Sequence, residues 1–181
     1  MEIAQVMGNL LSRKVLKTIM SANHFADLPL FQDLTPEDRE LVYPLFRVCR
    51  ESAGNVIFEQ GDPAINLYVV IDGDISILYK PDDGPEITIS HVRSEGVVGW
   101  SSAIGSPVYT STAVCSTECR LLCLSGDSLR KLYQEHPETG ALILGRLAAL
   151  IAERLKNTHQ YVMALLEQGL RIKIDNTVVT S

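Results

Sequence analysis

Apolar and polar residues alternate with a period of two over much of the stretch from Arg47 to Leu124. Ile75 and Ile77 alternate with Asp74 and Ser76, and similar alternation recurs over residues 67–71 and 87–90. Successive side chains of a β-strand point to opposite faces of its sheet, so this period indicates strands buried on one face. Turn-forming residues separate the runs, at 54–55, 61–63, 72–74, 82–85 and 105–107. Several short strands separated in this way predict an antiparallel sandwich or roll.

Helical signals flank this region. Thr35 followed by Pro36 predicts the start of a short helix that runs to about Phe46, because threonine caps open backbone amides and proline suits the first helical position. Ser125 predicts a second short helix to about residue 135, and His136-Pro137 interrupts it. A longer helix is expected from 138 to about 173. Apolar positions at helical spacing also predict an amphipathic helix over 3–20.

The long helix carries an apolar seam with steps of three and four residues, which suits packing on one side. We expect part of the seam to pack on the roll and the rest to meet a second copy, giving a homodimer. The seam consists of Leu144, Leu147, Ile151, Leu155, Thr158, Val162 and Leu165. The predicted organisation is a helical extension (1–26), a β-roll (27–136), a long helix (137–174) and a frayed tail (175–181).

The composition limits the possible partners and location. The chain has 181 residues and a net charge of −6, which argues against a large nucleic-acid-binding surface. The N-terminus lacks the features of a secretory signal, and no apolar run approaches the length of a membrane-spanning helix. We therefore expect a cytoplasmic protein without membrane insertion. The few residues after Lys173 cannot form a DNA-recognition helix, so DNA binding is not expected unless the chain is a fragment of something longer.

Three of the four cysteines, Cys115, Cys119 and Cys123, repeat every four residues, and the fourth is Cys49. The segment around the three is rich in Thr and Val and indicates a strand. On one strand, residues four apart lie about 13 Å from each other, too far for a single zinc ion. We predict that the three are small core residues on one sheet face, without metal or disulfides.

Glycines and apolar residues recur in a fixed order after the first short helix. They are Gly54, Ile57-Phe58, Gly61-Asp62, Leu67-Tyr68 and Gly73. With this ordered set, the stretch from Phe31 to Leu132 resembles the cyclic-nucleotide-binding domain family, shared by catabolite activator proteins and protein kinase A regulatory subunits. The resemblance implies a mainly β fold with flanking helices, in which an antiparallel double-stranded β-helix (a jelly roll) is followed by a long C-terminal helix.

The family's ligand lies in a phosphate-binding cassette, a short helix between two strands. A Gly-Glu pair begins it, the Glu takes the ribose hydroxyl, and an Arg just after a Pro pairs with the cyclic phosphate. In the matching stretch 98–112, Gly99 and Pro107 are in place, but the Glu position is Trp100 and the Arg position is Val108 or Tyr109. Neither Arg nor Lys occurs between residues 96 and 119. A phosphate left without its Arg costs about 2–5 kcal/mol, roughly a thirtyfold to several-thousandfold loss of affinity.

Two hypotheses for this stretch stay open from the sequence. Trp100 is a flat apolar wall that, with the hydroxyls around it, suits an uncharged or weakly anionic ligand. Alternatively, Trp100 fills and plugs a degenerate pocket. The candidate ligand-binding residues are Gly99, Trp100, Ser101, Ser102, Pro107, Tyr109, Thr110, Ser111 and Thr112.

The predicted function is a non-catalytic sensory or regulatory module that does not bind cyclic AMP in the usual way. It would couple a small ligand or a partner protein to the C-terminal helix, the mechanism that the family implies. Two alternatives are a genuine cyclic nucleotide receptor with a divergent pocket and a ligand-free interaction scaffold. His91 is the only histidine in the strand region and no nucleophile elbow is evident, so neither an enzyme nor a metal site is expected. A small-molecule or nucleotide ligand remains possible, and no cofactor is assigned.

Overall fold

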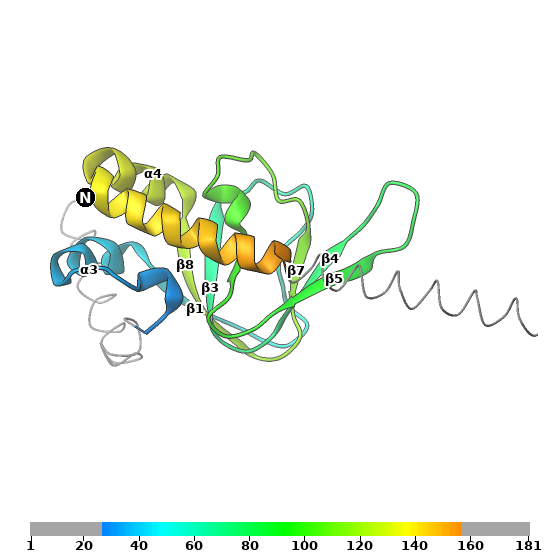
Figure 1. The fold of residues 1–181 in the computed structure, drawn as a ribbon. Helices are drawn as coiled ribbons and strands as arrows, with labels where there is room; N and C mark the ends of the chain where they lie inside the picture. The colour runs from blue at the N-terminus through cyan, green and yellow to red at the C-terminus, as the bar shows by residue number, and fades with distance from the viewer. Residues whose placement is uncertain (1–26, 157–181) are drawn as a thin grey trace, which may run out of the picture. The chain divides into compact units, whose positions relative to one another are not determined.

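The computed structural model describes residues 27–156, and this part of the chain forms two four-stranded antiparallel sheets (Figure 1). The strand order is β1-β8-β3-β6 in the first sheet and β2-β7-β4-β5 in the second. The predicted mainly β jelly-roll fold with flanking helices is confirmed. The strands are β1 (Arg47–Glu51), β2 (Val56–Phe58), β3 (Asn66–Asp72), β4 (Ile75–Tyr79), β5 (Ile87–Val92), β6 (Val97–Val98), β7 (Thr112–Cys115) and β8 (Cys119–Ser125).

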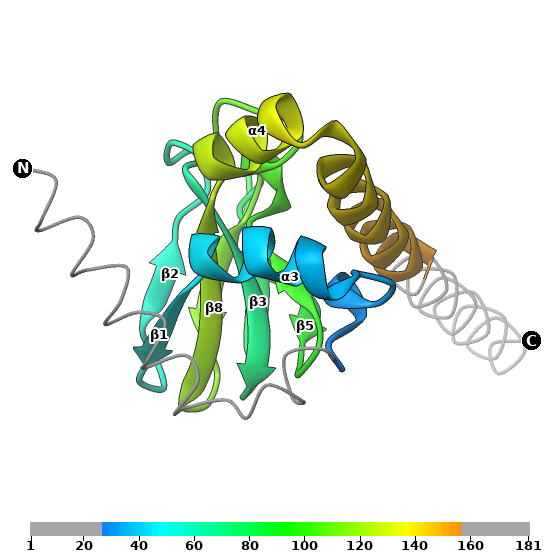
Figure 2. The same cartoon turned by 90° about the vertical axis from the view of Figure 1, so that its left-hand side faces the viewer.

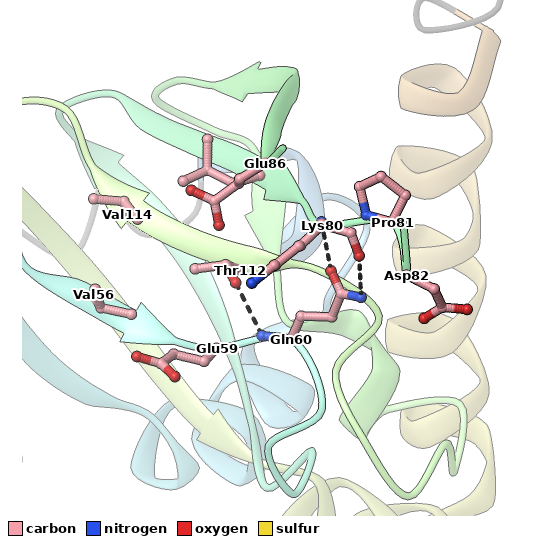
Figure 3. A pocket seen from close by; sticks show the side chains of 10 residues that line it. Val56, Glu59, Gln60, Lys80, Pro81, Asp82, Glu86, Thr112 and Val114 are labelled. Atoms are coloured by element: carbon pink, nitrogen blue, oxygen red, sulfur yellow. Dashed lines mark hydrogen bonds between the residues drawn. The ribbon is translucent and has the colours of Figure 1, made fainter. Parts of the chain in front are cut away.

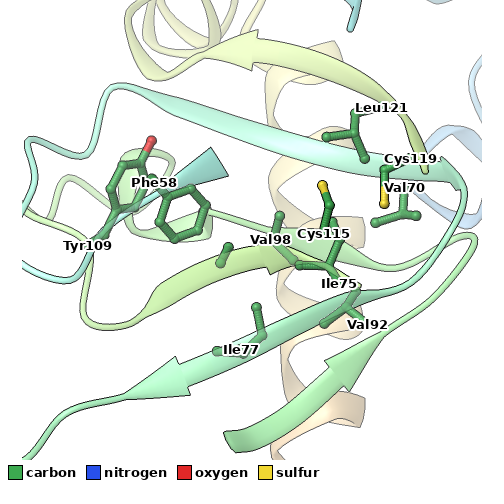
Figure 4. Packing of buried hydrophobic residues seen from close by; sticks show 11 residues of the cluster. Phe58, Val70, Ile75, Ile77, Val92, Val98, Tyr109, Cys115, Cys119 and Leu121 are labelled. Atoms are coloured by element: carbon green, nitrogen blue, oxygen red, sulfur yellow. The ribbon is translucent and has the colours of Figure 1, made fainter. Parts of the chain in front are cut away.

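The inward faces of the two sheets form the core of the roll (Figure 4). Ile75 and Ile77 of β4 project from the second sheet, and Val70 and Leu121 project from the first. Each is at most 2% exposed, as the period of two predicts. The alternation seen in the sequence therefore sets which side chains enter the interior.

The helix α3 (Pro36–Val42) begins with a capping box. The Thr35 hydroxyl accepts a hydrogen bond from the Asp38 backbone amide, and the Asp38 carboxylate accepts one from the Thr35 amide. The predicted helix to Phe46 changes type on the way: a 3-10 turn, η2 (Tyr43–Leu45), follows α3. Pro44 explains the change, because proline has no amide hydrogen to donate to the α-helical ladder. A further 3-10 turn, η1 (Pro29–Phe31), precedes α3.

The outward face of the first sheet is covered by the N-terminal helical elements. Figure 2 shows α3 lying over the side of the sheet that contains β8 and β3. Leu122 and Leu124 of β8 point to this side, since their neighbours Leu121 and Cys123 point inward, yet both are at most 1% exposed. The centre of this sheet, at β3 and β8, is therefore buried on both faces.

The helix α4 (Gly126–Glu135) starts at the predicted cap, where the Ser125 hydroxyl accepts a hydrogen bond from the Ser128 amide. It ends at His136, as expected for a residue before proline. Residues 137–156 then form a helix, which confirms the predicted start of the long C-terminal helix within one residue. Near its beginning, Thr139 donates a hydrogen bond to Asp38, and Arg146 forms an ion pair with Asp33.

The apolar seam of this helix is only partly described. Ile143 and Leu147 are buried and Leu144 is half-buried, so the buried stripe is centred closer to Ile143 than the sequence suggested. Residues up to Leu150 belong to one compact unit and Ile151 begins a second. In that second unit, Leu155 is 60% exposed.

Several predictions concern residues outside the described range. These are the helix over 3–20, the seam residues Thr158, Val162 and Leu165, and the tail from 175. The homodimer and the domain boundaries accordingly stay predictions.

The three regularly spaced cysteines are buried, as predicted, but the prediction of a single strand is wrong. Cys115 ends β7 in the second sheet, and Cys119 begins β8 in the first. Residues 116–118 carry the chain across the roll, and the Thr117 hydroxyl there accepts a hydrogen bond from the Asp74 amide. Cys115 and Cys119 therefore lie in the same core cluster, and both thiols are free.

Candidate functional site

The segment 98–112, called the cassette segment below, begins with a turn that only glycine suits. Gly99 has φ of +72°, a left-handed conformation that L side chains rarely adopt. A Cβ atom there would lie 2.7 Å from the carbonyl oxygen of Asn66, so the space also excludes a side chain. The short 3-10 helix η3 (Trp100–Ser102) follows, where the resemblance placed a short helix between two strands.

Tyr109 enters the interior of the roll from the far end of the cassette segment. Its ring is 4% exposed and stacks on Phe58, with the ring centroids 3.9 Å apart (Figure 4). Its hydroxyl donates a hydrogen bond to the Asn66 carbonyl (2.7 Å) and accepts one from the Asn66 amide (2.9 Å). Burial raises the pKa of Tyr109. Both the ring and the hydroxyl thus make contacts within the fold.

Phe58 also stacks on Tyr68, whose pKa burial raises to about 12. Phe58, Tyr68 and Tyr109 therefore form an aromatic cluster inside the roll, next to the cassette segment. Trp100 is half-buried on η3 and is not a member of the buried core cluster. The side chain that fills the interior beside the cassette segment is Tyr109.

Three of the six hydroxyl groups expected around a ligand, those of Ser102, Tyr109 and Thr112, are hydrogen-bonded within the protein. Ser102 is buried and donates to the Gly99 carbonyl (3.0 Å), and Thr112 accepts from the Gln60 amide (3.0 Å). The remaining candidate residues differ in exposure: Ser101 is buried, Ser111 is half-buried, and Thr110 and Pro107 are exposed. The candidate residues are thus gathered around one turn, but they do not all face one space.

The cassette segment is fastened to its neighbours at both ends. The Pro107 carbonyl accepts a hydrogen bond from the Ala64 amide (3.0 Å). At the other end η3 packs against the start of α4, where a Cβ on Gly126 would lie 2.4 Å from the Ser102 carbonyl oxygen. Because this contact leaves no room for a side chain, a shift of η3 towards α4 would displace the N-terminus of α4.

A second polar cluster lies on the outward face of the second sheet. Asp74 accepts hydrogen bonds from Arg93 (2.9 Å) and His91 (3.3 Å), and the Arg93 bond holds the pKa of Asp74 below its usual value. The same His91 nitrogen, Nδ1, also faces the Ser76 hydroxyl at 3.3 Å. A Ser-His-Asp relay needs both ring nitrogens of the histidine, one for each partner, so this cluster is not such a triad.

The described residues include neither a metal-binding group nor a membrane-spanning helix. Between positions 27 and 156, no group of three or more His, Cys, Asp or Glu side chains is arranged to hold a metal ion. The helices in this range are also too short or too polar to cross a membrane.

Comparison with known proteins identifies the domain. Residues 50–136 match the family model described as cyclic nucleotide-binding domain. Residues 50–136 belong to the cyclic-nucleotide-binding domain family.

Relatives of the domain include two named bacterial regulators. A CRP-like cAMP-activated global transcriptional regulator of Mycobacterium tuberculosis is 28% identical over 113 residues, 62% of this chain and 49% of that protein. A cyclic AMP receptor protein of Thermus thermophilus is 30% identical over 128 residues, 71% of this chain and 57% of that protein. The chain thus spans about half the length of these curated relatives.

A solved cyclic nucleotide-binding domain from Methylobacillus flagellatus has the same fold, with a TM-score of 0.71 over 78% of this chain and 83% of that one. The two are 20% identical, so this likeness speaks for the fold alone.

At the two positions that the resemblance assigns to charged ligand contacts, this cyclic-nucleotide-binding domain holds other residues. Trp100 follows Gly99, where the family places a Glu, and Val108 and Tyr109 follow Pro107, where it places an Arg. Val108 is 39% exposed, and Tyr109 is inside the aromatic cluster. The sequence showed the missing charges, but nothing local in it showed that Tyr109 turns inward. Its partner Phe58 is distant in the chain, and the two segments are brought together by the pairing of β2 with β7 and of residues 63 and 108.

Proposed function

We propose that the chain is a non-catalytic regulatory module whose roll does not bind cyclic AMP through the family's charged contacts. A ligand of different chemistry, or a partner protein, takes the place of cyclic AMP and acts on the C-terminal helix. The observation that carries the proposal is the position of Tyr109, which fills the interior of the roll beside the cassette segment with its hydroxyl hydrogen-bonded to Asn66.

Two separate costs oppose ordinary cyclic AMP binding. The phosphate would lack its Arg partner, which costs about 2–5 kcal/mol. A ligand in the interior would also have to displace Tyr109, losing the stacking on Phe58 and two hydrogen bonds worth about 1 kcal/mol each. When a site must first open, its apparent affinity is reduced in proportion to the fraction of molecules in which it is open. Each 1.4 kcal/mol of these costs weakens the affinity about tenfold.

The same contacts suggest how the module transmits a signal. η3 packs on the start of α4 at Gly126, and α4 leads through His136 into the helix over 137–156. That helix is joined to α3 by the Thr139–Asp38 hydrogen bond. A ligand or partner that prefers one position of η3 therefore shifts the population of the helical arrangement behind it.

Cyclic AMP is the first ligand to test, because the relatives are named for it. Trp100 is the only tryptophan and begins η3, so its fluorescence reports on the cassette segment. We expect cyclic AMP and cyclic GMP to change neither the emission nor the melting temperature. The Thermus thermophilus relative serves as the positive control. A saturable change at micromolar cyclic AMP, with a raised melting temperature, would overturn the proposal.

A panel of uncharged metabolites in the same assay separates a sensor from a scaffold. A saturable response to one of them identifies a sensor and its ligand class, whereas silence across the panel favours an interaction scaffold. The proposed homodimer is tested by sedimentation of the full chain, and a monomer at high concentration contradicts it.

A further inference from the structure

A groove of about 540 Å³ lies on the outward face of the second sheet, on the opposite side of that sheet from the aromatic cluster (Figure 3). Its floor is formed by Val56, Leu78 and Val114, from β2, β4 and β7. Val114 faces outward because its neighbours Ala113 and Cys115 are both in the core. We call this feature the outer groove. Its volume is within the range of about 300–1,000 Å³ that is common for ligand sites.

The floor of the outer groove is unusual for an outward sheet face, which normally alternates to polar residues. Val56 lies directly opposite Val114 in the β2–β7 pairing, and Leu78 pairs with Thr112 on the next strand. The aliphatic side chains therefore come from adjacent strands of one sheet. Val56 is 49% exposed, which leaves apolar surface open to a binding partner.

The rim of the outer groove is held in a fixed position by Gln60. Its side-chain amide accepts a hydrogen bond from the Lys80 backbone amide (2.9 Å) and donates one to the Lys80 carbonyl (3.1 Å). Its backbone amide donates to Thr112 (3.0 Å). Figure 3 shows two of these bonds joining the loop after β2 to the end of β4, and the third joining it to the start of β7. The groove is therefore bounded by a fixed framework, which reduces the entropy lost on binding.

The charges on the rim are mainly negative. Glu59, Asp82 and Glu86 contribute three carboxylates, against the single ammonium of Lys80. Among the residues that the structure describes, these four charged groups form no hydrogen bond or ion pair. An aliphatic floor with an acidic rim complements a ligand that is apolar on one side and cationic at its edges.

We propose that the outer groove binds a short segment of a partner protein in which aliphatic residues alternate with lysine or arginine. In an extended segment, alternate side chains point to opposite sides, so the aliphatic ones face Val56, Leu78 and Val114. The long, flexible side chains of lysine and arginine can then bend back to the carboxylates of the rim. The groove shares Thr112 with the cassette segment, but the three floor side chains and the rim charges lie outside that segment. This proposal therefore does not depend on whether the roll binds a nucleotide.

The test is methyl NMR of the full chain with three synthetic peptides of equal length. The peptides are acetyl-Lys-Val-Lys-Val-Lys-amide and its counterparts with Glu or Ser in place of Lys. We expect the Lys peptide to shift the methyl signals of Val56, Leu78 and Val114 at millimolar concentration, with weaker binding at higher salt. The Glu peptide should leave these signals unchanged, and the Ser peptide should bind more weakly than the Lys peptide.

Matched variants test the role of the rim. The double variant Glu59→Gln with Glu86→Gln removes two charges at exposed positions, so the fold is retained. It should weaken binding of the Lys peptide about fivefold, as expected for two exposed ion pairs. Glu135→Gln, an exposed residue at the end of α4, should have no effect. The proposal is overturned if the Lys peptide shifts none of the three methyl groups, if the Glu peptide shifts them equally, or if the double variant binds as the wild type does.

Discussion

Removing the hydroxyl of Tyr109 tests, through a single atom, how firmly this side chain is held inside the roll. Replacing Tyr109 with Phe keeps the ring on Phe58 and removes the oxygen that bonds to both the amide and the carbonyl of Asn66. Each of these bonds has near-ideal length, at 2.9 and 2.7 Å. The variant therefore measures what holds Tyr109 inside the roll, without opening a cavity.

The expected cost follows from the two hydrogen bonds. A partly buried hydrogen bond contributes about 1 kcal/mol, so Tyr109→Phe should lower the free energy of unfolding by about 2 kcal/mol. Urea unfolding followed by circular dichroism measures this directly. Tyr133→Phe is the matched control, since Tyr133 is 49% exposed and its hydroxyl has no hydrogen bond within the described residues. Its effect should stay within about 0.5 kcal/mol.

If Tyr109→Phe is as stable as Tyr133→Phe, the hydroxyl does not anchor the ring, and the cost assigned to displacing Tyr109 is wrong. Trp100 emission in the folded variant supplies a second check. It should match the wild type, because the ring remains and η3 keeps its support. A changed emission would show that the cassette segment depends on this hydroxyl for its conformation.

Three further predictions concern the turn at Gly99 and the buried thiols. Gly99→Ala should lower the free energy of unfolding by about 3 kcal/mol, against about 1 kcal/mol for Gly105→Ala, as measured by urea unfolding. Both glycines have positive φ, but only at Gly99 would a Cβ clash, so equal costs would refute the clash. Burial raises the pKa of Cys123 from 9.0 to about 11. The folded state thus favours the neutral thiol, and stability present below pH 9 is lost as the pH rises toward 11. This loss should be smaller in Cys123→Ala, and equal losses would contradict it. At pH 8, iodoacetamide should modify half-buried Cys49 faster than buried Cys115, and mass spectrometry showing equal rates would contradict this order.

The strands and the short helices could be predicted because their signals are local. The capping residues Thr35 and Ser125 act within three positions, and the alternation around Ile75 and Ile77 is visible in five residues. The fold class follows from these signals together with the spacing of the turns. The family resemblance then predicted the jelly-roll arrangement of the strands.

The crossing between Cys115 and Cys119 could not be predicted in the same way. The turn between them consists of Ser116, Thr117 and Glu118 and contains neither glycine nor proline. Its residue types therefore give little indication of a turn. The turn is stabilised from outside, by hydrogen bonds to Asp74 on another hairpin. A feature that depends on a distant residue gives no local signal, and the Thr- and Val-rich segment predicted a single strand.

The packing of the candidate site could not be predicted from the sequence, for the same reason. The sequence correctly placed Gly99, Trp100 and Tyr109 in one short segment, but the hypothesis of a plug assigned that role to Trp100. Which aromatic ring turns inward depends on Phe58 and Asn66, both far away in the sequence. The residue types indicated an aromatic site, and only the packing distinguishes a wall from a plug.

The positions that carry the family resemblance and the positions that contact the family's ligand are subject to different physical constraints. Gly73 has φ of +105°, and a Cβ there would lie 2.9 Å from the backbone of Cys119. Gly99 is excluded from carrying a side chain in the same way, by the carbonyl of Asn66. Both requirements come from the approach of one backbone to another, so they hold whether or not a ligand binds. The charged ligand contacts that the resemblance implies impose no such backbone requirement. Trp100 at one of these positions, and Val108 or Tyr109 at the other, are compatible with the same turns. A match over residues 50–136 therefore reports how the roll is built, and the ligand has to be argued from the cassette segment itself.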